Sequence, residues 1–194
     1  MATIIEDYWE NKLRAESAEK ITLQMIIFPP NWKQGPHPMW FAGDNTPYHI
    51  QAATIRAKLI VGRYHTQANV RVFRPQTDPT CLLCGAAIED DVHFLAVCQK
   101  LQPHREKRLE KIKECFSKES LPQPSTPIEI ASVLLNGSAY TCDVRGSRHG
   151  DHVIHLSSLD NAHYANKLAN ATCYALHIAR DIAMNCVLMD STAD

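Results

Sequence analysis

Four metal-binding side chains lie close together in this chain, in the spacing C-x2-C-x8-H-x4-C: Cys81, Cys84, His93 and Cys98. A two-residue gap lets two thiolates of one tight turn point at the same ion, and Gly85 permits the backbone angles that such a turn needs. Three thiolates and one imidazole are a standard tetrahedral set for zinc, so we expect one Zn²⁺ ion here. Because four protein ligands leave no coordination position open, the expected zinc is structural.

The last two ligands constrain the local backbone. Asp90 or Asp91 is suited to cap a short helix that carries His93. On an α-helix, residues five apart are about 140° apart around the axis, so Cys98 must lie at a turned helix end to reach the same ion. Three apolar residues are expected to pack beneath the site: Phe94, Leu95 and Val97. The alternative interpretation is a set of buried cysteines beside an incidental histidine.

The cysteine count favours metal binding over disulfides. Seven cysteines would leave one unpaired. Acidic residues at Glu6, Asp7 and Glu10 interrupt any signal-peptide core, and no apolar run approaches the length of a membrane span. We therefore expect an intracellular protein, nuclear or cytoplasmic, in a reducing compartment and without a membrane partner.

Apolar periodicity, prolines and glycines predict a mainly α fold, with helices around a small Cys3His unit. The expected helices span 3–28, 48–67, 103–118, 127–135 and 158–189. Loops or irregular segments are expected over 29–48, 68–80 and 138–157. The chain divides into an N-terminal helical region (1–74), the zinc unit with the basic helix that follows it (75–120) and a C-terminal helical region (121–194).

Two of the predicted helices carry specific signals. The sequence Thr126-Pro127-Ile128-Glu129 is a capping box that starts the helix over 127–135. The last helix is expected to bury a stripe made up of Tyr164, Leu168, Ala171, Ala175, Ile178, Ile182 and Met189. Cys173 and Cys186, on the same helix, show no ligand spacing and are interpreted as small core residues.

Charge is uneven along the chain although the net charge is only −1. Basic residues dominate over 51–80 and 99–120, on both sides of the zinc unit, and such segments can bind phosphates. Six are candidates for nucleic-acid contacts: Arg63, Arg71, Arg74, Lys100, Arg105 and Arg108. Tyr64 and Phe73 lie among them and could stack on unpaired bases, or they could be core aromatics beside a solvated edge.

Several segments resemble the region C-terminal to the polymerase domain in non-LTR retrotransposon reverse transcriptases, with copies from aquatic invertebrates looking most similar. The resemblance is carried by Arg56–Tyr64, by Asp78–Cys84, by Glu89–Leu95 with Cys98, and more loosely by His37–Trp40 and Cys173–His177. It covers residues 37–110 well. In that family this zinc knuckle is implicated in handling element RNA or target DNA. The resemblance also implies that the ligands of the family's knuckle correspond to Cys81, Cys84, His93 and Cys98 here.

The resemblance does not extend to catalysis. A polymerase needs paired aspartates for two metal ions, and the single Asp-Asp pair of this chain, Asp90-Asp91, lies inside the zinc loop. We therefore expect a non-catalytic module that binds RNA or single-stranded DNA. The alternative is a zinc-stabilised protein-interaction or scaffold remnant, favoured by the acidic balance of the last third. A further possibility is a second metal site, or an enzyme site, at His149, Asp151, His152 and His155, although a histidine-rich surface loop also explains them.

Overall fold

The computed structural model describes most of the chain from residue 37 onward. The described ranges are 37–44, 46–86, 88–142 and 152–190, with residues 8, 11, 12 and 15 before them. Side chains are not described at Cys142, at His152 or over 186–190. The helix expected over 3–28 therefore lies almost wholly outside the described residues, as does the first part of the loop expected over 29–48.

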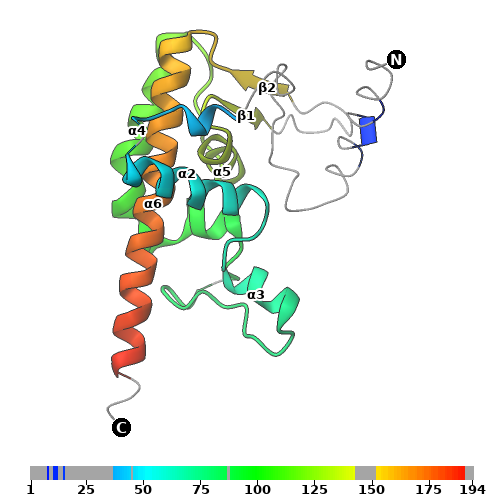
Figure 1. Ribbon diagram of the computed structural model, residues 1–194, viewed down its shortest axis with the longest axis vertical. Coiled ribbons are helices and arrows are strands. Elements are labelled where there is room, and N and C mark those ends of the chain that lie inside the picture. Colours follow the sequence, from blue (N-terminus) through cyan, green and yellow to red (C-terminus); the bar gives the residue numbers. More distant parts are fainter. Residues whose placement is uncertain are drawn as a thin grey trace.

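The described residues are mainly helical, which confirms the expected fold class. The helices are α2 (Pro47–Ile60), α3 (Gln67–Phe73), α4 (Gln102–Lys118), α5 (Pro127–Asn136) and α6 (Leu159–Asp190). Short 3-10 turns lie at Pro38–Trp40 and Gln99–Leu101, and a π-helical segment lies at His93–Val97. Figure 1 shows α4 and α6 side by side, with α2 and α5 packed against α6, while α3 lies apart from this layer.

Helix α2 is shorter than expected. The Thr46 side chain caps its first turn, and Pro47 takes the first helical position. Gly62 follows the helix with a φ of +61°, a left-handed conformation that ends helices and that glycine adopts without strain. The prediction that the helix continues through Gly62 to Gln67 is therefore wrong.

Helix α3 occupies the start of a segment that we expected to be irregular. The side chain of Thr66 caps its N-terminus. Glu89 accepts the N–H of Gln67 through its carboxylate at 2.9 Å and the N–H of Ala68 through its backbone carbonyl at 3.1 Å. These contacts from a distant segment satisfy the first amides of the helix, so they override the strand preference of its valines.

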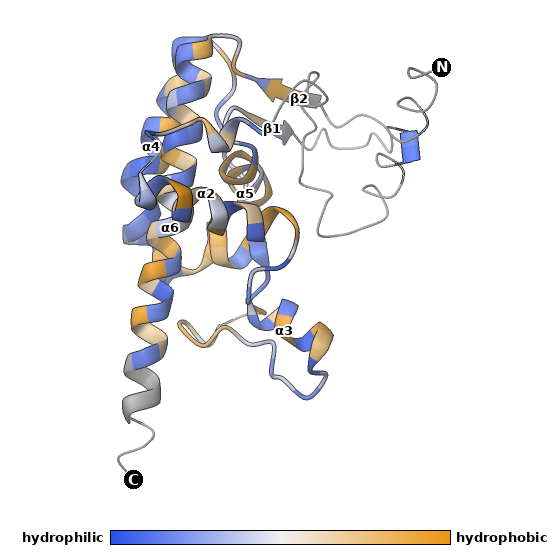
Figure 2. Cartoon of the chain, viewed as in Figure 1, coloured by the Kyte–Doolittle hydropathy of each residue, from blue (hydrophilic) through white to orange (hydrophobic). Residues whose placement is uncertain are grey.

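Helices α4 and α5 agree with the prediction. The expected apolar stripe of α4 is buried: Leu109, Ile112 and Phe116. The capping box of Thr126 and Glu129 is present at the start of α5, and Gly137, with a φ of +73°, ends it. Figure 2 shows α5 as almost uniformly apolar and α4 as largely hydrophilic, which fits an interior helix and an outer one.

A two-stranded antiparallel sheet lies in the segment for which we predicted no regular structure. Strand β1 (Ala139–Cys142) pairs with β2 (His152–His155), with Ala139 opposite His155. Fully buried Tyr140 anchors the hairpin, because its ring packs on Phe116 and its hydroxyl donates to a backbone carbonyl at 2.7 Å. Residues 143–151 lie outside the described residues, and His155 is exposed, so the proposed histidine cluster stays a prediction.

Helix α6 buries a different face from the one we predicted. Tyr164, Ile178 and Ile182 are 41%, 39% and 60% exposed. The buried face instead carries small and polar residues: Ala165, Asn166, Ala169, Asn170, Thr172, Cys173, Leu176 and Arg180. Small side chains let α6 pack closely on α4 and α2, and of the predicted stripe Leu168 is partly buried against the core. The interpretation of Cys173 as a core residue is confirmed.

The C-terminus of α4 holds the N-terminus of α6. The Glu119 carboxylate accepts the backbone N–H and the hydroxyl of Ser157, both at 2.7 Å, and the side-chain amide of Asn161 at 2.9 Å. These hydrogen bonds lower the pKa of Glu119 to about 2. These bonds join the C-terminus of α4 to the N-terminus of α6, in addition to the packing of the two helices along their length.

One apolar core runs through residues of all three predicted regions. It includes Leu59 and Tyr64 from the first, Phe94 and Ile112 from the second, and Leu134, Cys173 and Leu176 from the third. Within the described residues, no helix combines the length and the apolar character needed to cross a membrane.

Candidate metal centre

A tight turn presents the first two cysteines. Cys81 and Cys84 lie on the loop that follows α3, and the N–H of Gly85 donates to the carbonyl of Cys81 at 2.8 Å. Gly85 has a φ of +66°, as the spacing predicted, so a residue with a side chain would be strained there. An isolated β-bridge between Thr80 and Ile88 closes the base of this loop.

A capped π-turn presents the other two ligands. Asp90 accepts the backbone N–H of His93 through its side chain at 2.7 Å, so the predicted cap is present and Asp90 provides it. The N–H of Cys98 then donates to the carbonyl of His93 at 2.8 Å, which is the i→i+5 bond of a π-helix. This bond brings the two ligands to the same side of the turn. The backbone leaves the helical region at Cys98, as expected.

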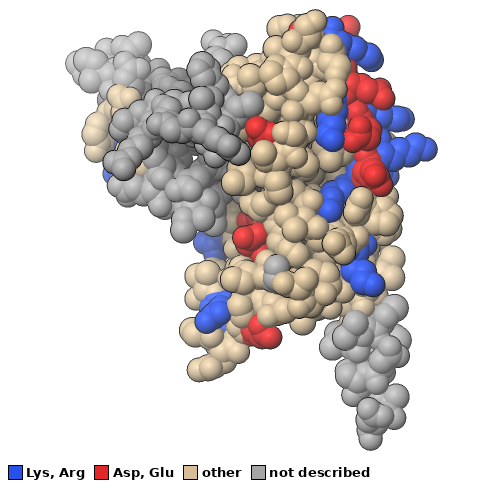
Figure 3. Space-filling model, turned by 180° about the vertical axis from the view of Figure 1, so that it is seen from behind, with Lys and Arg blue, Asp and Glu red and all other residues tan. Residues whose placement is uncertain are grey.

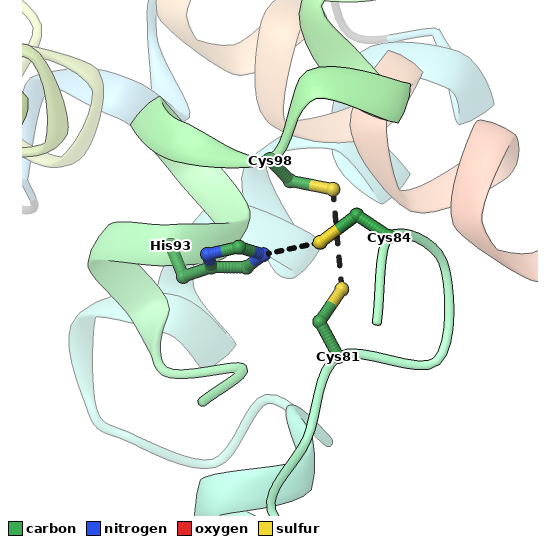
Figure 4. Close-up of side chains that lie close together, drawn as sticks. All are labelled: Cys81, Cys84, His93 and Cys98. Atoms are coloured by element: carbon green, nitrogen blue, oxygen red, sulfur yellow. Dashed lines mark hydrogen bonds between the residues drawn. The ribbon is translucent and has the colours of Figure 1, made fainter. Parts of the chain in front are cut away.

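The four donor atoms converge on one point (Figure 4). They all lie within 4.8 Å of one another, with 3.9 Å between the sulfurs of Cys81 and Cys98 and 3.3 Å between Cys84 Sγ and His93 Nε2. Around a tetrahedral zinc ion the sulfur–sulfur separation is about 3.8 Å and the sulfur–nitrogen separation about 3.5 Å. The cluster could therefore hold a metal ion with little rearrangement.

The cluster is part of the protein interior. Cys81 and Cys98 are 1% exposed and His93 is 6% exposed. Phe94 and Leu95 are fully buried next to the site, whereas Val97, which we also expected there, is 43% exposed. Because the ligands are members of the main core, filling the site would stabilise the whole fold rather than a peripheral loop.

Burial opposes ionisation of two of the thiols. It raises the pKa of Cys81 to about 12 and also raises the pKa of Cys98. Burial opposes ionisation of Cys84 as well, but hydrogen bonds from the Ala86 amide and the neighbouring thiols outweigh it, so the pKa of Cys84 is lowered. A bound metal would have to displace protons from the buried thiols, so metal binding releases protons.

Arg105 lies beside the cluster and not on the surface. It is 6% exposed, so the prediction that it grips a phosphate is wrong. One terminal nitrogen of its guanidinium, Nη1, is buried and finds no hydrogen-bond partner among the described residues. Burial lowers the pKa of Arg105, and the charge of Cys98 acts in the opposite direction. Three thiolates, a neutral imidazole and Zn²⁺ carry a net charge of −1, which the Arg105 cation would offset.

Arg105→Met is therefore expected to weaken Zn²⁺ binding by about tenfold, because the site loses its buried counter-charge. Competition with a chromophoric chelator measures the change. Lys107→Met is the matched control, since it removes the same charge from an exposed position on the same helix. Equal zinc affinity of the two variants would contradict a role for Arg105 at the site.

The remaining predicted nucleic-acid residues form two separate groups. Arg63, Arg71 and Arg74 are exposed around α3. Lys100 is exposed on the turn before α4, and Arg108 is half-buried on α4, where it donates to the His104 carbonyl at 3.0 Å. Figure 3 shows Lys and Arg side chains interspersed with Asp and Glu along the edge where α4 lies. Tyr64 is buried and cannot stack on a base from solution, whereas Phe73 is 69% exposed.

A buried ion pair that the sequence analysis missed ties the segment between Cys84 and His93, called the metal loop below, to α6. Glu89 and Arg180 are 1% and 2% exposed in their side chains, and two hydrogen bonds of 2.7 and 3.0 Å join them. The Arg180 guanidinium also donates to the carbonyl of His65 at 3.1 Å. Nothing in the spacing of these residues indicates the contact, because they are far apart in the sequence. From the sequence alone, each would be predicted to be a charged side chain exposed to solvent.

The burial of Arg56 was also missed, although its position on the helix indicated it. Arg56 is fully buried, and its guanidinium donates to the carbonyl of Leu135 at 3.0 Å and to the side-chain oxygens of Asn166 and Asn170 at 3.1 and 2.9 Å. Burial lowers its pKa to about 10. Arg56 lies on the apolar face of α2, one turn before Ile60, and that helical position indicated burial.

Comparison of the chain with known protein families, with curated proteins and with solved structures finds no match.

Proposed function

We propose that this chain is a zinc-stabilised, non-catalytic module that binds RNA or single-stranded DNA. The proposed contact region, called the α3 surface below, consists of Arg63, Arg71, Phe73 and Arg74. The zinc ion is proposed for the Cys3His cluster because three thiolates and an imidazole suit zinc and leave no coordination position open for substrate.

The exposure of Phe73 carries the nucleic-acid proposal. Its side chain is 69% exposed, and the adjacent Val72 is 74% exposed. The Arg63 guanidinium lies 5.7 Å from the centre of the Phe73 ring, and Arg71 and Arg74 are exposed on the same short helix or just beyond it. An exposed aromatic ring among arginines suits an unpaired strand, because bases stack on the ring while guanidiniums bind phosphates.

The metal loop holds the α3 surface in place. Glu89 binds the first two amides of α3, and Asp91 accepts the side-chain amide of Asn69 at 3.2 Å. Both acidic residues lie between the ligands Cys84 and His93. Zinc binding would order this loop and, through it, the helix that carries the arginines.

The basic residues of α4 have a smaller place in the proposal. Lys100 lies on the 3-10 turn just before α4, and Arg108 lies on α4 itself, where Glu106, Glu110 and Glu114 alternate with the basic residues. Such a mixed surface is typical of a solvated helix face, and it attracts phosphates less than the α3 surface does.

The proposed origin of the chain is a non-LTR retroelement reverse transcriptase. Its support is the resemblance of residues 37–110 to the segment that follows the polymerase domain in that family. A nucleic-acid role would then continue the role implied for the zinc knuckle of the parent element.

Fluorescence anisotropy with a labelled single-stranded RNA and a labelled single-stranded DNA tests the proposal. We expect binding at low salt that weakens as salt increases, with a log–log slope of about −2 if three arginines neutralise phosphates. Phe73→Ala is expected to weaken binding by about fivefold or more, since stacking contributes about 1–3 kcal/mol per base. Replacing Arg71 and Arg74 with glutamine should flatten the salt slope.

Lys111→Gln is the matched control, because it removes a charge from an exposed position of α4. It should leave the affinity unchanged. Negligible affinity for both nucleic acids at low salt would overturn the proposal. The exposed pair Val72 and Phe73 would then favour a protein partner, and the chain would be a zinc-stabilised interaction module.

A further inference from the structure

We propose that His65, His177 and Asp181 form a second metal site, which takes a divalent transition-metal ion such as Zn²⁺. His65 lies in the link between α2 and α3, whereas His177 and Asp181 lie one turn apart on α6. One donor atom from each residue lies within 4.8 Å of the others. The Asp181 carboxylate faces both rings, at 3.7 Å from His65 Nε2 and 3.5 Å from His177 Nε2.

The surrounding contacts orient the two rings. The Tyr64 hydroxyl is 3.2 Å from His177 Nδ1, so Nε2 is the nitrogen left to face Asp181. The rings of Tyr64 and His65 stack at 4.5 Å between centroids, and the carbonyl of His65 accepts a hydrogen bond from Arg180. His177 is thus held as metal-binding histidines are, with its second ring nitrogen bonded to a neighbouring polar group that fixes the tautomer, whereas His65 is positioned by its ring stack on Tyr64.

Burial is the main effect that favours neutral imidazoles at the cluster. Burial lowers the pKa of His65 and of His177, and Arg180 lowers both further against the opposing effect of Asp181. Lys58 also lowers the pKa of His177. The positive charge of Arg180 is already offset by Glu89. Neutral rings keep the lone pairs that a metal ion needs, and Asp181 supplies the negative charge.

The site differs in kind from the Cys3His cluster. Two imidazoles and one carboxylate supply three ligands and leave at least one coordination position for water or another ligand. The side chains of His65 and Asp181 are 52% and 43% exposed, so the ion can exchange with solution. The buried cysteine site would hold its metal tightly, whereas this site would fill and empty as the available metal concentration changes.

Metal titration of the intact protein tests the inference. Protein that already carries one equivalent of zinc is desalted and titrated with Zn²⁺ in equilibrium dialysis, and separately with Co²⁺. We expect a second equivalent to bind, and Co²⁺ to bind without the intense sulfur-to-cobalt absorption of a thiolate site. The imidazole ¹⁵N resonances of His65 and His177 should shift together.

Asp181→Asn and His177→Gln are each expected to weaken binding of the second equivalent at least tenfold while the first equivalent stays bound. His163→Gln, at an exposed position of the same helix, is the matched control and should retain both equivalents. Two results would overturn the inference: a wild-type protein that binds no second equivalent, or variants of Asp181 and His177 that bind it as well as the control does.

Discussion

Cys84→Ser is expected to remove zinc from the purified protein and to lower its thermal unfolding midpoint by about 10 °C or more. The apparent free energy of zinc binding at structural sites is about 10–16 kcal/mol, which is comparable with the whole stability of a domain. A loss of several kcal/mol corresponds to a shift of that size in a chain of this length. Elemental analysis and circular dichroism melting measure the two effects.

The position of the ligands explains why the effect reaches beyond the loop. Cys81 and Cys98 belong to the same core cluster as Leu101 and Phe116 of the α4 region. A bound ion would join three cysteines and one histidine of this interior, so its loss would loosen the packing around all four residues. Treating the wild-type protein with a strong chelator should therefore give the same loosened state as the variant.

Cys115→Ala is the matched control for this experiment. Cys115 is also buried, but its thiol contacts the Lys111 carbonyl at 3.3 Å and lies outside the cluster. The variant should keep one equivalent of zinc and unfold cooperatively at a modestly lower temperature. A wild-type protein that folds cooperatively without any zinc would contradict the metal site.

The metal cluster was predictable because its geometry is mostly local. Cys81 and Cys84 need only a tight turn with Gly85, and the capped segment from Asp90 to Cys98 needs only nine residues of chain. The helix boundaries at α4 and α5 were predictable for the same reason, since caps and prolines act on their neighbours. Each of these features depends on residues that are close in sequence.

The buried face of α6 could not be predicted in that way. Large apolar residues such as Ile178 and Ile182 point to solvent, while Asn166 and Asn170 are buried because they bind Arg56. Which face is buried depends on a partner more than a hundred residues away. Helix α3 was missed for a related reason, because Glu89 satisfies its first amides from outside.

Glu89→Gln is expected to lower the free energy of unfolding by about 3–5 kcal/mol, the usual cost of leaving one member of a buried ion pair without its partner. The amide can still occupy the position of the carboxylate, but the Arg180 cation then lies in the interior without an opposing charge. Because Glu89 lies between two metal ligands, the variant should also bind zinc more weakly. Urea unfolding at fixed zinc concentration and chelator competition measure the two effects.

Two further variants separate loss of the charge pair from general damage. The double variant Glu89→Gln, Arg180→Met should regain part of the lost stability, since it leaves no unpaired buried charge and replaces Arg180 with an apolar chain of similar length. Glu110→Gln, which breaks the exposed pair with Lys113 (3.0 Å), should cost less than about 1 kcal/mol. If the Glu89 variant were no less stable than the Glu110 variant, the ion pair would not be what joins the metal loop to α6. Zinc would then order α3 without help from the long C-terminal helix.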